Sequence, residues 1–199
     1  QGESITSILA MPKEKKAAEG LSLVMVTKDG TVKKSSADKF KEVRRSGLIA
    51  ITLDQGDSLI SAQFAREGDD VILTTAKGQS IRFAEDDVRE MGRQAAGVRG
   101  MKLDAKDFVV GAGVIPKGSK DAELLVLSST GYGKKTPLSE YKTQGRGGSG
   151  IKTMSMTTKT GPLITSRIIS RGDDGEEEIV VVSKKGQVIR TSLSEVKTQ

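Results

Sequence analysis

A glycine-dense loop contains the residue types that could bind phosphate, and it reads Gln144-Gly145-Arg146-Gly147-Gly148-Ser149-Gly150. Its glycines have the G-x-G-x-x-G spacing of dinucleotide-binding loops, which requires a strand before the loop and a helix after it. The next residues, Ile151-Lys-Thr-Met-Ser-Met-Thr, alternate and are rich in Thr, which predicts a strand instead. The loop is therefore not expected to bind a dinucleotide, but its backbone amides could still approach phosphates closely.

The composition excludes several kinds of active site. The 199 residues include no Cys and no His, which excludes disulfide frameworks, zinc fingers, thiol catalysis and His-based triads. A chain without Cys fits a reducing, cytoplasmic setting, and no apolar run approaches the roughly 20 residues of a membrane span. The acidic pairs Asp86/Asp87 and Asp173/Asp174 are typical of solvated loops. We therefore expect no catalytic residue, no metal and no cofactor in this chain.

The charge distribution favours an anionic partner. The formal net charge is +6, and residues 132–160 hold one acid, Glu140, among the basic residues Lys134, Lys135, Lys142, Arg146, Lys152 and Lys159. The chain has 4 Phe, 2 Tyr and no Trp, so it lacks the stacking platforms that single-strand binders use. This composition favours duplex nucleic acid bound through its backbone.

Four similar hairpins predict a repeat architecture. Each is an apolar run that ends in a turn glycine and is followed by a short second run, and the turn glycines are Gly30, Gly78, Gly131 and Gly186. They lie 48, 53 and 55 residues apart, which is close to the period of a four-stranded propeller blade. A further glycine opens another strand in three units, at 47–51, 97–103 and 150–154, and a fourth strand closes each of them.

The repeats divide the chain into one all-β domain of about four blade equivalents. We expect a tail strand and linker at 1–20, complete blades at 21–69, 70–122 and 123–177, and the front half of another blade at 178–199. Residues 1–12 resemble the last strand of a blade, because Gln1-Gly-Glu-Ser matches Gln55-Gly-Asp-Ser. We interpret both ends as cuts in a longer chain.

Basic residues recur at fixed distances from the turn glycines. A basic residue lies four positions after each turn glycine, and an arginine lies fifteen positions after three of the turn glycines. The first set is Lys34, Arg82, Lys135 and Arg190, and the second is Arg45, Arg93 and Arg146. Together with Arg44, Lys134, Lys142 and Lys152, they predict a basic rim that binds duplex DNA. The alternative is structural: glycine loops often form bulges, and bases on hairpins often protect strand edges.

The loop 144–150 and the stretch Gly131-Tyr-Gly-Lys-Lys-Thr-Pro-Leu-Ser-Glu-Tyr141 resemble the family of C-terminal domains found in the A protein of DNA gyrase. The resemblance covers the whole chain. It implies a β-pinwheel, whose blades exchange strands with their neighbours, cut from a six-bladed domain. The loop is similar to a degenerate copy of the family's box, Gln-Arg-Arg-Gly-Gly-Lys-Gly, with Gly145 and Ser149 at two of its basic positions.

The resemblance implies a part of a larger machine. The expected role is to wrap double-stranded DNA for ATP-dependent negative supercoiling by a type IIA topoisomerase, in a heterotetramer of gyrase A and gyrase B proteins. ATP and Mg would be used elsewhere in that enzyme, and the setting would be the cytoplasm, close to the nucleoid. Three alternatives stay open: the corresponding domain of topoisomerase IV, a protein-interaction propeller, and an enzyme built on a propeller, which the absence of His and Cys disfavours.

Overall fold

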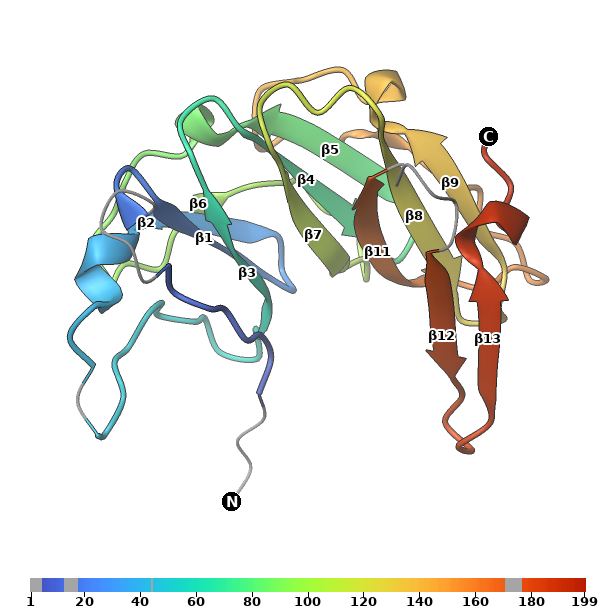
Figure 1. Cartoon of the computed structure of the whole chain (residues 1–199), viewed down its shortest axis with the longest axis horizontal. Helices are drawn as coiled ribbons and strands as arrows, with labels where there is room; N and C mark the ends of the chain where they lie inside the picture. Colours follow the sequence, from blue (N-terminus) through green and yellow to red (C-terminus); the bar gives the residue numbers. More distant parts are fainter. Residues whose placement is uncertain (1–4, 13–17, 44, 171–176) are drawn as a thin grey trace.

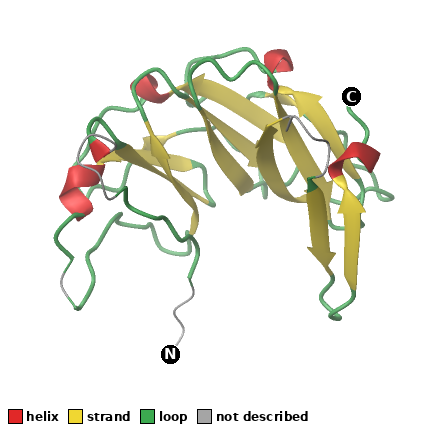
Figure 2. Ribbon diagram, viewed as in Figure 1, coloured by secondary structure: helices red, strands yellow, loops and turns green. Residues whose placement is uncertain are grey.

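The computed structural model describes residues 5–12, 18–43, 45–170 and 177–199, which form β-strands and short 3-10 turns (Figure 2). Four sheets follow one another along an arc (Figure 1). The strands are β1 Ser22–Thr27, β2 Thr31–Ser36, β3 Leu59–Ala65, β4 Asp70–Thr75, β5 Gln79–Ala84, β6 Val98–Arg99, β7 Val109–Ile115, β8 Ala122–Ser128, β9 Gly133–Pro137, β10 Ile151–Lys152, β11 Leu163–Ser170, β12 Glu178–Val182 and β13 Val188–Ser192. The 3-10 turns are η1 Ala37–Phe40, η2 Glu85–Asp87, η3 Leu138–Glu140 and η4 Leu193–Glu195.

The four predicted hairpins are present, and each turns at its glycine. Gly30, Gly78, Gly131 and Gly186 have φ values of 81°, 83°, 87° and 80°, a left-handed conformation that other residues adopt only with strain. In every turn the glycine N–H donates to the carbonyl three residues earlier, at 2.9–3.1 Å. The repeated glycine therefore fixes the same turn in all four units.

Neighbouring repeats exchange strands, as the resemblance implied. The sheet orders are β3-β1-β2-β6, β10-β5-β4-β7, β11-β8-β9 and β12-β13. The short strand β6 comes from the second repeat but pairs with β2 of the first, and β10 of the third repeat pairs with β5 of the second. The fold is thus an all-β pinwheel with repeated blades.

Some strands expected within single units are shorter or lie elsewhere. The strand after each arginine loop has two residues in β6 and β10, and it belongs to the sheet of the preceding repeat. Residues 47–51, the corresponding stretch of the first repeat, form no strand, and neither do residues 5–12. A strand requires a ladder of paired backbone groups, whereas these segments are held through side chains. The Ser7 hydroxyl donates to the Ala62 carbonyl at 3.1 Å, and the Ala50 carbonyl accepts from Lys33.

The core lies between adjacent sheets, because the central strands are buried on both faces. On β4, Val71 and Leu73 pack toward the first sheet, whereas Ile72 packs toward the third. Tyr141 and Leu163 belong to the same apolar cluster as Ile72, and Met154 and Met156 pack against it. The outer edge of each four-stranded sheet carries the exchanged strand, and β3, β7 and β11 form the inner edge. No helix in the described residues is long and apolar enough to cross a membrane.

Candidate nucleic-acid interface

The arginine loops of the second and third repeats lie against the outer strand of the preceding repeat. The residue thirteen positions after a turn glycine donates its N–H to the carbonyl of the base four positions after the previous turn glycine. The three bonds join Met91 to Lys34, Gln144 to Arg82, and Gln199 to Lys135, each at 2.8 Å. One repeated backbone contact therefore places successive arginine loops at equivalent positions along the arc.

The glycines of the loop 144–150 allow close packing against the neighbouring repeat. Gly147 donates its N–H to the Gly100 carbonyl at 2.7 Å, and the Gly148 carbonyl accepts from the Lys102 N–H at 2.8 Å. Gly150 has φ of 73°, and a Cβ there would lie within 2.7 Å of the Ser80 carbonyl carbon. The Gly147 amide is thus engaged within the protein, so the expectation that the loop amides cradle phosphate does not hold for Gly147.

The Arg146 side chain connects the third repeat to the second while staying exposed. Its Nε donates to the Asp87 carbonyl at 2.8 Å, and its Nη1 donates to the Arg99 carbonyl at 2.9 Å. Asp87 belongs to η2 and Arg99 to β6, so the guanidinium lies where two loops of the second repeat meet the third. Arg146 therefore fixes the loop as well as offering a positive charge to solvent.

The basic residues four positions after the turn glycines form ion pairs. Three of them pair with an acid twelve residues earlier, diagonally across the hairpin. These pairs are Arg82 with Asp70 at 2.7 Å, Lys135 with Glu123 at 3.8 Å, and Arg190 with Glu178. The first repeat has Ser22 at the acid position, and Lys34 pairs instead with Glu85 of the second repeat.

Two of these bases also connect adjacent repeats. Lys34 Nζ donates to the Glu85 carbonyl at 3.2 Å, and Arg82 Nη1 donates to the Leu138 carbonyl at 2.9 Å. Both carbonyls lie seven residues after the next turn glycine. Lys34 is 8 % exposed, and burial raises the pKa of its partner Glu85, although Lys34 itself opposes that shift. Lys34, Arg82, Lys135 and Arg190 therefore take part in structural ion pairs, as the structural alternative expected, and their contacts with DNA stay a prediction.

The remaining expected bases differ in exposure. Arg45, Lys142, Arg146 and Lys152 are exposed, and Arg93 and Lys134 are half-buried. Burial lowers the pKa of Lys134. Arg44 lies outside the described residues. The exposed bases Lys142, Arg146 and Lys152 all belong to the third repeat, around its glycine loop.

Arg99 and Lys102 are exposed bases that the repeat analysis missed. Arg99 lies on β6 and Lys152 on β10, and both are 21 residues after a turn glycine. The Arg99 side chain runs beside Gly147, where an added Cβ would lie 3.9 Å from its Cδ. Comparing residues up to 21 positions after each turn glycine would have revealed this register. We term four exposed residues the outer-edge basic residues: Arg99, Lys102, Arg146 and Lys152.

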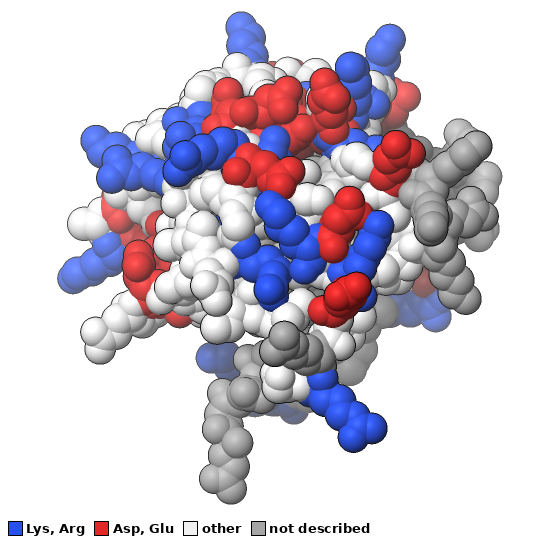
Figure 3. All heavy atoms as spheres, turned by 90° about the vertical axis from the view of Figure 1, so that its left-hand side faces the viewer, with Lys and Arg blue, Asp and Glu red and all other residues white. Residues whose placement is uncertain are grey.

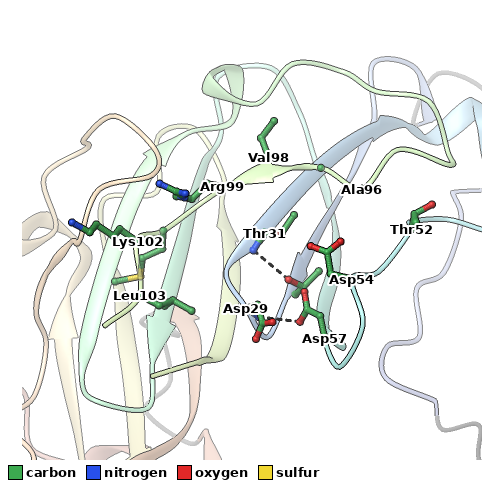
Figure 4. A pocket seen from close by; sticks show the side chains of 13 residues that line it. Asp29, Thr31, Thr52, Asp54, Asp57, Ala96, Val98, Arg99, Lys102 and Leu103 are labelled. Atoms are coloured by element: carbon green, nitrogen blue, oxygen red, sulfur yellow. Dashed lines mark hydrogen bonds between the residues drawn. The ribbon is translucent and has the colours of Figure 1, made fainter. Parts of the chain in front are cut away.

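Acidic side chains limit how far the basic surface extends. Figure 3 shows the end of the arc that carries the first repeat, where Lys and Arg alternate with Asp and Glu. A cleft of about 480 Å³ beside β6 has Arg99 and Lys102 on one side and Asp29, Asp54 and Asp57 on the other (Figure 4). Asp57 accepts from the Asp29 N–H at 3.0 Å, so it holds the hairpin turn. These carboxylates would repel phosphate within the cleft, which leaves the exposed edge as the candidate interface.

The comparisons with known proteins identify relatives along the whole chain. The sequence model of the family described as "DNA gyrase C-terminal domain, beta-propeller" matches residues 22–66, 69–116, 122–170 and 177–199. The DNA gyrase A protein of Staphylococcus epidermidis is 38% identical over 194 residues, covering 98% of this chain and 21% of that protein. The gyrase A protein of Deinococcus deserti is 40% identical over 176 residues, covering 87% of this chain and 21% of that protein. The chain thus spans about a fifth of these relatives.

Two solved structures share the fold. A DNA gyrase A C-terminal domain superposes with a TM-score of 0.77 at 29% identity, covering 91% of this chain and 58% of the other. The C-terminal domain of DNA topoisomerase IV gives a TM-score of 0.81 at 24% identity, covering 90% of this chain and 55% of the other.

Proposed function

This chain belongs to the DNA gyrase C-terminal domain family, and we propose that it binds and wraps duplex DNA as a module of a type IIA topoisomerase. The observation that carries this proposal is the recurrence of exposed basic residues on the exchanged β-strands. Arg99 and Lys152 occupy the same register in successive repeats, with Arg146 beside Arg99. Basic residues at equivalent points of two successive repeats suit a partner with regularly spaced phosphates.

Contacts of this kind are tolerant of sequence and sensitive to salt. Lysine and arginine on the edge of a sheet neutralise phosphates and release counterions, whatever the base sequence. Bending a site of 20–30 base pairs costs on the order of 1–6 kcal/mol, so several modest contacts must act together. The repeated loops supply such contacts at successive points of the arc.

The parent enzyme is part of the same proposal. The gyrase relatives suggest ATP-dependent negative supercoiling by a heterotetramer with gyrase B proteins, in the cytoplasm close to the nucleoid. ATP and Mg would act in other parts of that complex. The sequence relatives named here are gyrase A proteins at 35–40% identity, and of the two solved structures the gyrase A domain has the higher identity, 29% against 24%, which favours gyrase as the parent. We assign no catalytic residue, metal or cofactor to this chain.

Wrapping is expected to change the linking number of closed DNA. Relaxed circular DNA incubated with the chain and then ligated should show a shift of one sign that grows with protein concentration and decreases with salt, because the bend is held by phosphate contacts. Neutralising the outer edge with Arg99→Gln, Lys102→Gln and Lys152→Gln should reduce the shift severalfold.

The matched control, which we call the inner-side variant, removes the same charge from the inner strand β11 and from the loop after the inner strand β7. Lys117 and Lys120 follow the inner strand β7, and Arg167 lies on the inner strand β11. The Lys117→Gln, Lys120→Gln, Arg167→Gln variant should keep most of the shift. Equal losses in the two variants would show that net charge alone is responsible, and no shift with the unaltered chain would contradict wrapping.

A further inference from the structure

The residue three positions after each turn glycine alternates between Lys and Ile. These residues are Lys33, Ile81, Lys134 and Ile189. Lys33 and Ile81 are both fully buried, at 0% exposure. Lys33 is also among the largest fully buried side chains. A buried lysine at a position where the next repeat has an isoleucine needs a specific set of partners, because an unpaired charge is costly to bury.

The Lys33 ammonium group holds two backbone carbonyls. Its Nζ donates to the Ala50 carbonyl at 2.5 Å and also to the Arg93 carbonyl. Ala50 follows the arginine loop of the first repeat, and Arg93 is the loop arginine of the second. Lys33 therefore lies under the point where the Arg93 loop crosses the outer strand β2.

Ile81 holds the next loop in a different way. A Cβ added at Gly148 would lie 3.5 Å from Ile81 Cδ1, so the glycine loop packs directly on this apolar side chain. The loop above Lys33 reads Arg93-Gln-Ala-Ala-Gly97, whereas the loop above Ile81 reads Arg146-Gly-Gly-Ser-Gly150. The residue on the outer strand and the composition of the covering loop thus change together.

We propose that Lys33 is a positioning residue for DNA binding: its ammonium group fixes the Arg93 carbonyl and thereby holds the second arginine loop against the outer edge. This inference rests on the proposed function, because the DNA contacts of the outer edge are themselves proposed. Lys33 acts through the backbone of the loop and is too deeply buried to touch DNA.

The surroundings of Lys33 make this anchor sensitive to pH. Burial lowers its pKa from 10.5 to about 8, and the positive charges of Lys39 on η1 and Arg93 on the loop contribute. The carboxylate nearby, Glu90, pairs with Lys39 at 2.6 Å. Release of the loop would hydrate Lys33 and return its pKa towards 10.5, so the form in which the loop is held becomes more favoured as the pH rises through about 8.

The expected result is an alkaline gain of DNA affinity. Between pH 7 and pH 9 the affinity for a linear duplex should rise about threefold, because Lys33 loses its proton at a lower pH when the loop covers it than when water reaches it. Between about pH 8 and 10.5 the unfolded chain keeps a proton that folded Lys33 has released, so the contribution of Lys33 to folding stability rises with pH.

The test compares fluorescence anisotropy titrations of linear duplex DNA at fixed ionic strength across this pH range. Lys33→Met should bind about threefold more weakly at pH 7 and show no transition near pH 8, because its side chain has no charge to lose. Lys120→Met removes the same charge from an exposed loop and should keep the transition. Thermal unfolding checks that each variant is folded.

A designed exchange of anchors keeps the test decisive if Lys33→Met does not fold. Lys33→Ile combined with Gln94→Gly and Ala95→Gly copies the arrangement of Ile81 and the glycine loop. This variant should bind as the unaltered chain does at pH 7, without the alkaline transition. A flat profile in the unaltered chain, or an unchanged transition after loss of Lys33, would overturn the proposal. Absence of DNA binding at every pH would instead contradict the proposed function.

Discussion

Replacing Gly150 with alanine should destabilise the chain by about 4 kcal/mol and displace the loop that contains Arg146. Gly150 has φ of 73°, a conformation that costs a residue with a Cβ about 1–2 kcal/mol. The new Cβ would also lie within 2.7 Å of the Ser80 carbonyl carbon and closer still to its oxygen. These are backbone atoms of a central sheet, so they cannot move aside.

Gly145→Ala is the matched control in the same loop. Its φ is not positive, and no atom outside its immediate neighbours lies within 4 Å of an added Cβ. Denaturant unfolding should show a change of less than about 0.5 kcal/mol for Gly145→Ala. A similar loss of stability in both variants would mean that the close approach to Ser80 does not constrain the loop.

Replacing Arg82 with methionine should cost about 3–4 kcal/mol of folding free energy, because it leaves Asp70 largely buried without its partner. The side chains of Arg82 and Asp70 are 20% and 18% exposed, and their pair is 2.7 Å long. The change also removes the donor to the Leu138 carbonyl, which connects the second and third repeats. We expect cooperative unfolding at lower denaturant concentration.

Arg190→Met tests the same register in an exposed setting. The pair of Arg190 with Glu178 has exposures of 70% and 41%, and exposed pairs typically contribute about 0–1 kcal/mol. Its loss should therefore change stability by less than about 1 kcal/mol. The combination of Arg82→Met with Asp70→Asn should recover part of the lost stability, because it removes the uncompensated charge. Equal effects of Arg82→Met and Arg190→Met would contradict the assigned role.

The hairpins were predictable because their signals are local. An apolar run, a glycine that adopts positive φ and a second run specify a turn within about fifteen residues, and all four hairpins formed as expected. Strand exchange was not visible in the repeat pattern itself. The pairing of β6 with β2 joins residues that are far apart in the sequence, Val32 and Val98 among them, and it came only from the resemblance.

The charged residues were harder to interpret because the sequence pattern of a Lys or Arg is the same whether the residue forms an ion pair or lies on a free surface. Arg82 and Arg190 recur in register, which also fits a structural ion pair repeated by the fold. The acid twelve residues earlier, Asp70 or Glu178, was a readable signal for that role. Arg99 escaped notice because its equivalent in the third repeat is Lys152, while the first repeat has Ile51 there.

The central claim is that exposed Lys and Arg side chains, on the exchanged strands and beside them, bind DNA phosphates. The most direct measurement is the dependence of duplex affinity on salt, plotted as the logarithm of the binding constant against the logarithm of salt concentration. Each lost phosphate contact lowers the slope by about 0.9, so Arg99→Gln, Lys102→Gln and Lys152→Gln together should reduce its magnitude by about 3. The inner-side variant of Lys117, Lys120 and Arg167 should keep the original slope. An unchanged slope in the outer-edge variant would contradict the account.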